Sequence, residues 1–355
     1  MKVGDGLLIV DVACPRPYSA ETLDREALGG TEATVVRVAR GLARARPVWV
    51  AQRGRSRPIF DAGVRWVPYE HDSRGAVGVE DVVVVRNHKI LRRLRERHPE
   101  ARLFLWMHCF PGKRLHGLGR AALESDATVV AVSEHHRRVM RGFLAEHDPL
   151  AAARVRIISI HNPIEASLRP NDAPVDPDKL VFLSSPHKGL AEVVRTFAAA
   201  RRRLPSLRLF VANPGYLRWP IELPEGVVTL GELPHAEAMQ HTREAFCLFD
   251  PQAGFAETFG LVFAEANAVG TPVLAHPVGA AEEVLAQEPA QIVDATSPVA
   301  VIERLIEWRT QGRPRVGPDF RFQPEHVLRC WEAAFEAAAR RGLGDAEADA
   351  RGIYP

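Results

Sequence analysis

Cysteine is scarce in this chain of 355 residues. The four cysteines, Cys14, Cys109, Cys247 and Cys330, lie far apart and form no Cys-x-x-Cys pair. This spacing excludes a zinc ribbon and a dithiol redox motif. Because a chain without a disulfide framework is typical of a reducing compartment, we expect a cytoplasmic protein.

Long hydrophobic runs are missing as well. The apolar run at residues 7–10 is flanked by Asp5 and Asp11 and is too short for the hydrophobic region of a signal peptide. Elsewhere no apolar run approaches the length of about 18 residues that a membrane-spanning helix needs. The sequence therefore predicts neither a secretion signal nor a membrane span.

The chain also lacks an excess of charge of one sign. Its 46 Lys and Arg residues against 44 Asp and Glu residues give a net charge of +2, which excludes a protein that binds nucleic acids mainly by neutralising phosphates. The sum hides an asymmetry, since residues 1–165 hold 27 basic and 19 acidic residues, and residues 166–355 hold 19 and 25. This division, +8 against −6, suggests two units with different functions.

Several catalytic signatures are absent. The sequence contains no Gly-x-Ser-x-Gly motif, no Walker lysine motif and no His-Glu-x-x-His motif. It therefore lacks the usual marks of an α/β-hydrolase, a P-loop nucleotidase and a zinc protease.

What the chain does contain is a regular alternation of short apolar runs and helix-like segments. Runs such as residues 82–85, four valines, are apolar on both faces, as in parallel strands covered by helices. The proline-rich segment 162–178 interrupts this pattern, and a second series of the same kind follows it. The alternation predicts two doubly wound, Rossmann-like domains at residues 1–165 and 166–319. A helix at 320–341, expected to pack back on the first domain, and a tail at 342–355 complete the chain.

The most informative window covers residues 254–273, where Glu257 and Glu265 stand eight positions apart. Glu257 lies in a predicted loop, and Glu265 lies inside a predicted helix that begins near Gly260. The first amides of such a helix, from Phe259, Gly260, Leu261 and Val262, form a ready site for a phosphate. The plainer alternative is that Glu257 only complements the helix dipole and Glu265 lies on a solvated face. Since Glu265 is surrounded by apolar residues, we favour a buried carboxylate that needs a partner.

These residues resemble the signature of the retaining glycosyltransferases of family 4. The shared features are the two glutamates with seven residues between them, the Gly-Thr-Pro-Val run at 270–273 and the Gly-x-x-Glu segment at 279–282. Weaker similarities, among them Gly29-Gly30-Thr31-Glu32, extend over nearly the whole chain. The resemblance implies an α/β protein of the GT-B fold, with an N-terminal acceptor domain and a C-terminal donor domain facing a central cleft.

The resemblance also implies roles for individual residues. Lys188 corresponds to a lysine that contacts the donor diphosphate, Gly30 to a backbone that approaches it, and Glu265 to a carboxylate that holds the ribose. His108 corresponds to a histidine that contacts the donor sugar near the reacting carbon, with His88 as a second candidate. The family usually has an arginine about five residues before the lysine; here Leu183-Ser184-Ser185 stands in its place. The hydroxyl of Ser184 or Ser185, or His187, is expected to substitute for it.

The segment 86–102 contains seven Lys and Arg residues against two Glu residues. A solvated amphipathic helix is the simpler interpretation. The alternative is a peripheral contact with an anionic membrane or with a charged acceptor.

The resemblance, together with these features, implies a retaining glycosyltransferase that moves a sugar from a nucleotide diphosphate sugar, UDP- or GDP-linked, to an acceptor hydroxyl. The acceptor is a polysaccharide, a lipid-linked glycan or a small natural product, and Glu257, Lys188 and His108 are the expected catalytic residues. We expect no cofactor and no metal, because fixed groups of the protein would meet the charge of the donor phosphates. Two alternatives stay open: a glycoside phosphorylase or synthase on the same fold, and an inactive protein that binds sugar nucleotides.

Overall fold

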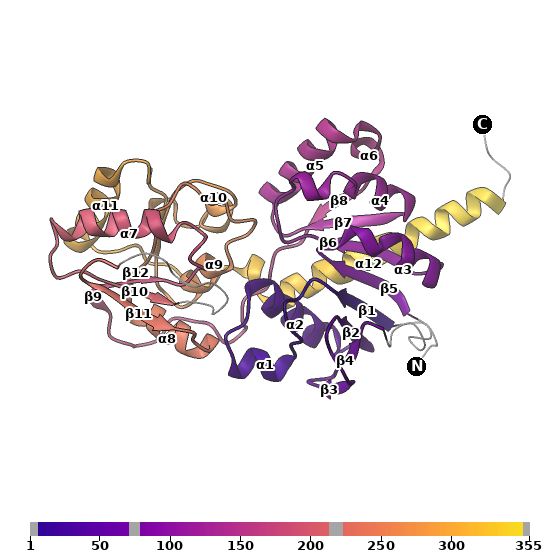
Figure 1. Ribbon diagram of the computed structural model, residues 1–355, viewed down its shortest axis with the longest axis horizontal. Coiled ribbons are helices and arrows are strands. Elements are labelled where there is room, and N and C mark those ends of the chain that lie inside the picture. Colours follow the sequence, from indigo (N-terminus) through magenta and orange to yellow (C-terminus); the bar gives the residue numbers. More distant parts are fainter. Residues whose placement is uncertain (1–5, 71–78, 213–222, 351–355) are drawn as a thin grey trace.

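The computed structural model describes residues 6–70, 79–212 and 223–350, with side chains as far as residue 340. These residues form two α/β units, each built on its own sheet (Figure 1). The first sheet has eight strands and the second has five.

The strand order in the first sheet is β3-β4-β2-β1-β5-β6-β7-β8, and every pairing is parallel except that of β3 with β4. The strands are β1 (Gly6–Asp11), β2 (Val48–Gln52), β3 (Ile59–Asp61), β4 (Val64–Pro68), β5 (Val79–Val85), β6 (Arg102–Trp106), β7 (Ala127–Ala131) and β8 (Ile157–Ser159).

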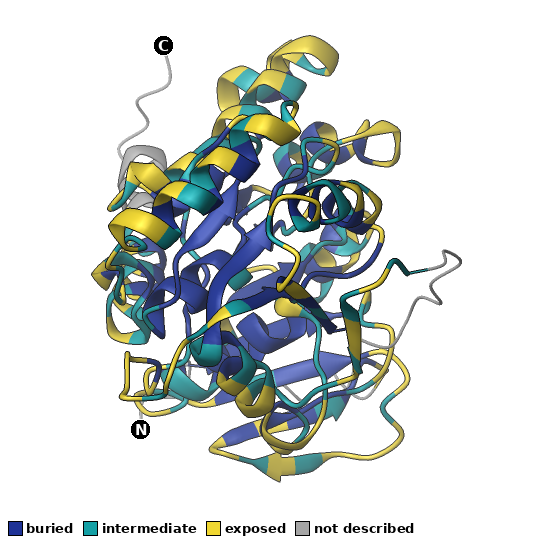
Figure 2. Cartoon of the chain, turned by 90° about the vertical axis from the view of Figure 1, so that its left-hand side faces the viewer, coloured by how far each residue is buried: buried dark blue, intermediate teal, exposed yellow. Residues whose placement is uncertain are grey.

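Helices cover both faces of this sheet, as its strands require. In β1, Leu7 and Ile9 belong to one apolar core while Leu8 and Val10 belong to another, so the strand is buried on both sides. The first core includes α2 (Gly30–Leu42). The second includes residues of four helices, α3 (Leu91–Arg97), α4 (Leu118–Glu124), α5 (Glu134–His147) and α6 (Pro149–Arg154). Figure 2 shows the strands buried between helices whose outer faces are exposed.

The second sheet has the order β11-β10-β9-β12-β13 and is parallel throughout. Its strands are β9 (Asp176–Phe182), β10 (Arg208–Ala212), β11 (Val227–Gly231), β12 (Ala245–Asp250) and β13 (Val273–Ala275). Its helices are α7 (Leu190–Arg201), α8 (His235–Glu244), α9 (Leu261–Ala268), α10 (Ala281–Val284) and α11 (Pro298–Gln311).

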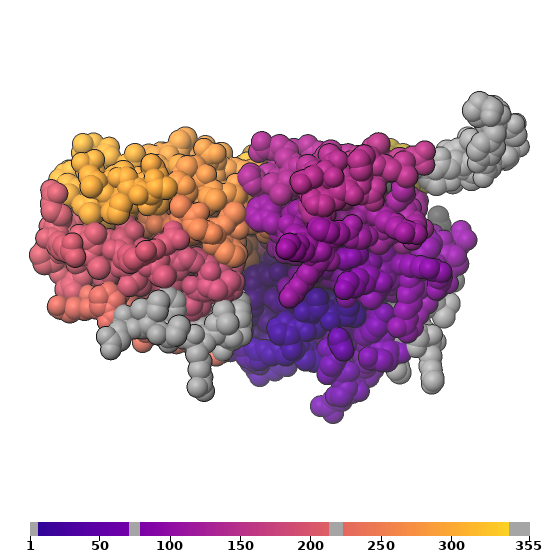
Figure 3. All heavy atoms as spheres, turned by 45° about the horizontal axis from the view of Figure 1, so that its top comes forward, coloured from indigo at the N-terminus to yellow at the C-terminus, as the bar shows by residue number. Residues whose placement is uncertain are grey.

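The last helix, α12 (Pro324–Ala350), returns to the first unit and packs against α2 and β6. Trp331 and Phe335 pack edge-to-face against the rings of Phe104 and Trp106, with centroids 4.9–6.4 Å apart. One apolar core therefore contains α2 and α12 together with α8, α9 and α10 of the second unit. In the space-filling view the two halves of the chain meet along one continuous seam (Figure 3).

Several elements differ from the sequence-based expectation. The last helix begins at Pro324 and ends at Ala350 rather than spanning 320–341, because η5 (Phe320–Phe322) precedes it and the alanine-rich residues after 336 favour a longer helix. Residues 351–355 of the expected tail lie outside the described part of the chain. Two short elements lie outside the regular alternation: η4 (Pro289–Gln291), which a single bridge between Ala275 and Ile292 follows, and α1 (Ala20–Arg25), which precedes Gly29.

Candidate active site

The site is built where the strand order of the second sheet reverses, between β9 and β12. Doubly wound sheets bind ligands in the crevice at this point, outside the carboxyl ends of their strands. The turn after β9 carries Lys188, β12 ends at Asp250, and the loop that follows β12 carries Glu257.

Lys188 and Glu257, which the sequence singles out, form an ion pair. The distance from Lys188 Nζ to Glu257 Oε1 is 2.8 Å, and their side chains are 30% and 12% exposed. Gly189, with φ of +91°, is the N-cap residue of α7, and a Cβ there would overlap the side chain of Gln252. This position therefore requires glycine, and it fixes the turn that presents Lys188.

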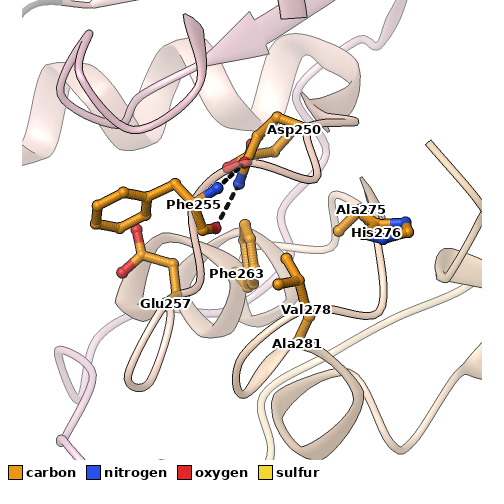
Figure 4. Close-up of a pocket in the computed structure, with 9 residues that line it drawn as sticks. Asp250, Phe255, Glu257, Phe263, Ala275, His276, Val278 and Ala281 are labelled. Carbon is orange, nitrogen blue, oxygen red and sulfur yellow. Dashed lines mark hydrogen bonds between the residues drawn. The ribbon is translucent and has the colours of Figure 1, made fainter. Parts of the chain in front are cut away.

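The loop that carries Glu257 is held on both sides. Gln252 and Phe255 exchange two hydrogen bonds of 2.9 and 2.8 Å, and Glu192 of α7 accepts a hydrogen bond from the Ala253 amide at 2.9 Å. The Ala280 amide donates to the Glu257 carbonyl at 2.9 Å. Figure 4 shows this loop along one side of a small pocket, with Ala275 and His276 opposite it. Glu257 is thus presented by an ordered backbone.

Asp250 is a site residue that the sequence analysis missed. Its side chain lines the same pocket and is buried, and its Oδ1 has no hydrogen-bond partner among the described residues. Burial and the nearby Glu257 raise the pKa of Asp250 to about 8, against the opposing effect of Lys188. A carboxyl group at the end of an otherwise apolar strand was the signal that could have identified it.

The N-terminus of α9 is the expected anion site. Gly260 takes a left-handed conformation, with φ of +86°, and no described side chain caps the helix start that follows it. A Cβ on Gly30, at the start of α2, would lie 3.6 Å from Leu261 Cδ2. The structure therefore brings Gly30 of the first domain against the helix start formed by Gly260, Leu261 and Val262.

The side chains of Phe259 and Ser185 are buried and do not face a ligand site in this structure. Phe259 is buried, with its ring 5.1 Å from that of Phe322 and 5.8 Å from that of His161. Ser185 is also buried, and its carbonyl accepts the Lys188 amide at 2.9 Å. Residues 183–188, which form this turn, include no arginine.

Glu265 is buried, as expected, and already has protein partners. Its Oε1 lies 2.8 Å from Arg37 Nη2 and 2.9 Å from His235 Nε2. Burial alone would raise the pKa of Glu265, but the charges and hydrogen bonds of His235 and Arg37 lower it to about 2. The carboxylate is therefore ionised at neutral pH, and these two side chains are its partners in the structure.

His108 stands next to the Glu257 loop, across the junction of the domains. Thr258 Oγ1 donates to the His108 carbonyl at 3.1 Å, and Ser133 Oγ donates to the Thr258 carbonyl at 2.6 Å. The His108 ring packs on Trp106 at 4.7 Å, and its Nε2 is buried with no partner among the described residues. Burial, Arg86 and His136 hold the pKa of His108 well below its usual value, so the imidazole is neutral.

Arg86 is a second residue that the sequence analysis did not assign. It follows β5 with φ of +60°, a rare conformation for a side chain of this size. Its Nη2 donates to Glu32 at 2.9 Å and lies 3.8 Å from Asp11 of β1. Strands β1 and β5 thus end in a cluster of charges beside His108. His88, the second histidine candidate, is the first residue of η2 (His88–Ile90) and is buried. Burial and the nearby positive charge of Lys89 both lower the pKa of His88.

Most basic residues of the segment 86–102 have structural partners. Arg95 donates to the carbonyls of Pro99, Ala101 and Ser125, and Arg102 pairs with Asp81 at 2.6 Å. The segment folds as η2 and α3, and of its seven basic residues Lys89, Arg92 and Arg93 are exposed.

Among residues 6–70, 79–212 and 223–350, no group of three or more His, Cys, Asp and Glu side chains is arranged to hold a metal ion. No helix in the described part of the chain is long and apolar enough to cross a membrane.

The sequence profile of Glycosyl transferases group 1 matches residues 165–316, which contain Lys188, Glu257 and α9. No curated protein sequence matches the chain.

Solved structures share the fold of both domains. A glycosyltransferase from Rickettsia africae ESF-5 is 13% identical, with a TM-score of 0.66 over 95% of this chain and 99% of that chain. An α,α-trehalose-phosphate synthase (UDP-forming) from Burkholderia xenovorans, in complex with glucose-6-phosphate, is 10% identical, with a TM-score of 0.64 over 94% and 99%.

The pneumococcal O-GlcNAc transferase GtfA, in complex with UDP and GlcNAc, is 15% identical, with a TM-score of 0.55 over 73% of this chain and 57% of that chain. The present chain thus spans little more than half the length of that enzyme. The two Rossmann-like domains found here are the architecture that these GT-B structures share. The chain therefore has the GT-B fold, and its residues 165–316 match the profile of Glycosyl transferases group 1.

Proposed function

We propose that this protein is a retaining glycosyltransferase that transfers a sugar from a nucleotide diphosphate sugar to an acceptor hydroxyl. One observation carries the proposal: the Lys188–Glu257 pair lies in the loops beside the uncapped start of α9, and Gly30 faces that start from the other domain. This arrangement offers positive charge for a diphosphate and a carboxylate for sugar hydroxyls in one place. The group 1 domain supports the same interpretation.

In this proposal Lys188 and the first amides of α9 stabilise the diphosphate as it leaves. Fixed donors aimed at developing charge are an effective form of catalysis, because they need no rearrangement during the reaction. A helix start is such a donor for phosphate. The net charge of −6 on residues 166–355 does not oppose this, since placed local groups dominate at contact distance.

Glu257 accepts hydrogen bonds from the donor sugar, and the neutral His108 contacts the sugar near its reacting carbon. The bond from that carbon to the diphosphate breaks as the acceptor oxygen bonds to it from the same face. The acceptor proton passes to a phosphate oxygen of the leaving group. This sequence needs no covalent nucleophile and no metal, and it retains the configuration of the anomeric carbon.

The acceptor in this proposal binds the first domain, at the ends of β1 and β5 beside His108. Its class is a polysaccharide, a lipid-linked glycan or a small natural product. Residues 15–27 and 53–59 follow β1 and β2 in the chain, and they are the segments that we expect to contact the acceptor.

The first experiment is a thermal-unfolding screen with UDP, GDP, ADP and the corresponding sugar nucleotides. A ligand at 100 times its Kd stabilises the protein by about 2.7 kcal/mol, which gives a clear shift. Stabilisation by one nucleotide in the wild type, reduced in K188A, is the expected result. The absence of any shift with all of them would contradict the proposal.

The second experiment measures release of the selected nucleotide with candidate acceptors and determines the anomeric configuration of the product by NMR. We expect retention, with turnover lost in E257Q. Inversion would refute the retaining mechanism, and release of a sugar phosphate by orthophosphate would instead identify a phosphorylase. If the turnover of the wild type is no higher than that of E257Q, the protein binds sugar nucleotides without acting on them.

A further inference from the structure

Arg37 connects the two domains through a buried side chain. It lies on α2 of the first domain, and its side chain is 4% exposed. Its Nη2 pairs with Glu265 of α9 at 2.8 Å, and its Nη1 donates to the Pro163 carbonyl, in the segment between the domains, at 3.2 Å. The guanidinium is therefore held by the second domain and by the connection to it.

Glu265 receives a second donor from its own domain. His235, the first residue of α8, lies 2.9 Å from the same Oε1 that pairs with Arg37, and the two donors are 3.2 Å apart. The Glu265 side chain is 5% exposed. One oxygen of a buried carboxylate thus has partners from α2 and α8 at once.

The proposed function assigns this carboxylate to the ribose of the donor, and the inference below depends on that assignment. A ribose diol needs carboxylate oxygens that are accessible to its two hydroxyls. In the present structure Arg37 covers Glu265, so the diol and the guanidinium compete for one group. Since Arg37 and Glu265 belong to different domains, the exchange also removes a contact between the domains.

We propose that Arg37 covers Glu265 in the ligand-free protein and that the ribose diol of the donor takes its place. Arg37 is then a positioning residue that acts through Glu265. It lowers the affinity for the nucleotide, and it links donor binding to loosening of the domain junction. Its buried Nε has no hydrogen-bond partner among the described residues and only a long ion pair, 3.8 Å, with Glu165, so this part of the guanidinium is weakly held.

The test compares R37M with the wild type. The probes are UDP, GDP and ADP, each beside its 2′,3′-dideoxy form, with dissociation constants measured by calorimetry. We expect R37M to bind the preferred ribonucleotide about tenfold more tightly, because no ion pair has to be displaced. The dideoxy form lacks the diol and should gain nothing. R37K keeps the charge and should bind like the wild type.

A matched control removes a different contact between the domains. Glu283 of the second domain accepts hydrogen bonds from the amides of Glu134 and His135 and from His161, each at 2.8 Å. E283Q weakens this contact without touching Glu265, so any change in nucleotide affinity should be small and equal for the ribonucleotide and its dideoxy form. A gain in E283Q equal to that in R37M would refute the exchange, since any loosening would then suffice.

The remaining outcomes are distinct. Equal or weaker ribonucleotide binding by R37M overturns the inference and leaves the proposed function intact. An equal gain for the dideoxy form overturns it too, because the diol is then not involved. Failure of all three nucleotides to bind any form overturns the proposed function together with the inference. If R37M does not fold, R37Q replaces it: its neutral amide binds Glu265 more weakly than the guanidinium does, so the ribonucleotide should gain less than tenfold while the dideoxy form still gains nothing.

Discussion

The buried carboxyl of Asp250 makes the stability of this protein depend on pH in a defined direction. In the folded chain its pKa is raised from 3.8 to about 8 by burial and by Glu257. Between these two values the unfolded chain has lost the proton that the folded chain keeps, so stability falls as pH rises. The slope is about 1.4 kcal/mol per pH unit, and the whole interval corresponds to about 6 kcal/mol.

The substitution D250N tests this prediction, because asparagine has a similar shape and no ionisable proton. At each pH the difference in unfolding free energy between D250N and the wild type is measured. This difference should grow by about 4 kcal/mol in favour of D250N between pH 5 and pH 8, because that range covers about three of the pH units over which the wild type loses stability. Above pH 8 the gain should stop increasing. The measurement is urea-induced unfolding of both proteins at each pH.

A second aspartate provides the baseline for this measurement. Asp24 has a side chain that is 65% exposed, and D24N measures what an Asp-to-Asn change does away from the site. The reasoning is refuted if the gain of D250N stays constant within about 1 kcal/mol from pH 5 to 8. E257Q removes one of the two causes of the raised pKa of Asp250. In this variant the loss of stability should therefore end at a lower pH than in the wild type.

Three further predictions concern the site. K188A should weaken nucleotide diphosphate binding about 10–100-fold, as loss of a charge-assisted hydrogen bond implies; calorimetry against K89A, an exposed lysine, checks this. G279A should lower the unfolding free energy by about 2–4 kcal/mol, because Gly279 has φ of +66° and a Cβ there would overlap the Glu257 carbonyl; G317A, where a Cβ meets nothing within 4 Å, is the control in urea unfolding. H108Q should reduce kcat about 100-fold with nucleotide affinity unchanged, since His108 is assigned to the sugar; a parallel loss of nucleotide affinity would contradict that role.

Sequence patterns predicted the parts of the fold that depend on periodicity. The apolar runs of β1, β5 and β7 identify buried parallel strands because both of their faces are apolar, and the order of strands and helices follows. The short helix α1 was missed, since six residues between Ser19 and Glu26 carry too little periodicity to stand out from a loop.

The candidate site was predictable only where a local motif exists. Glu257, Glu265 and Lys188 lie in recognisable windows. Arg37 and Asp250 do not, because their roles arise from contacts between residues that are far apart in sequence. Arg37 meets Glu265 across 228 positions, and no pattern around either residue indicates that pairing.

The return of α12 to the first domain determines the order in which the chain can complete its structure during synthesis. Trp331 and Phe335 supply part of the apolar core beneath β6, and they emerge from the ribosome after every strand of the second sheet. The second domain therefore has all of its strands available while the first still exposes the rings of Phe104 and Trp106. The domain that is synthesised first is therefore completed last. A C-terminal truncation that removes Trp331 and Phe335 would destabilise the N-terminal domain.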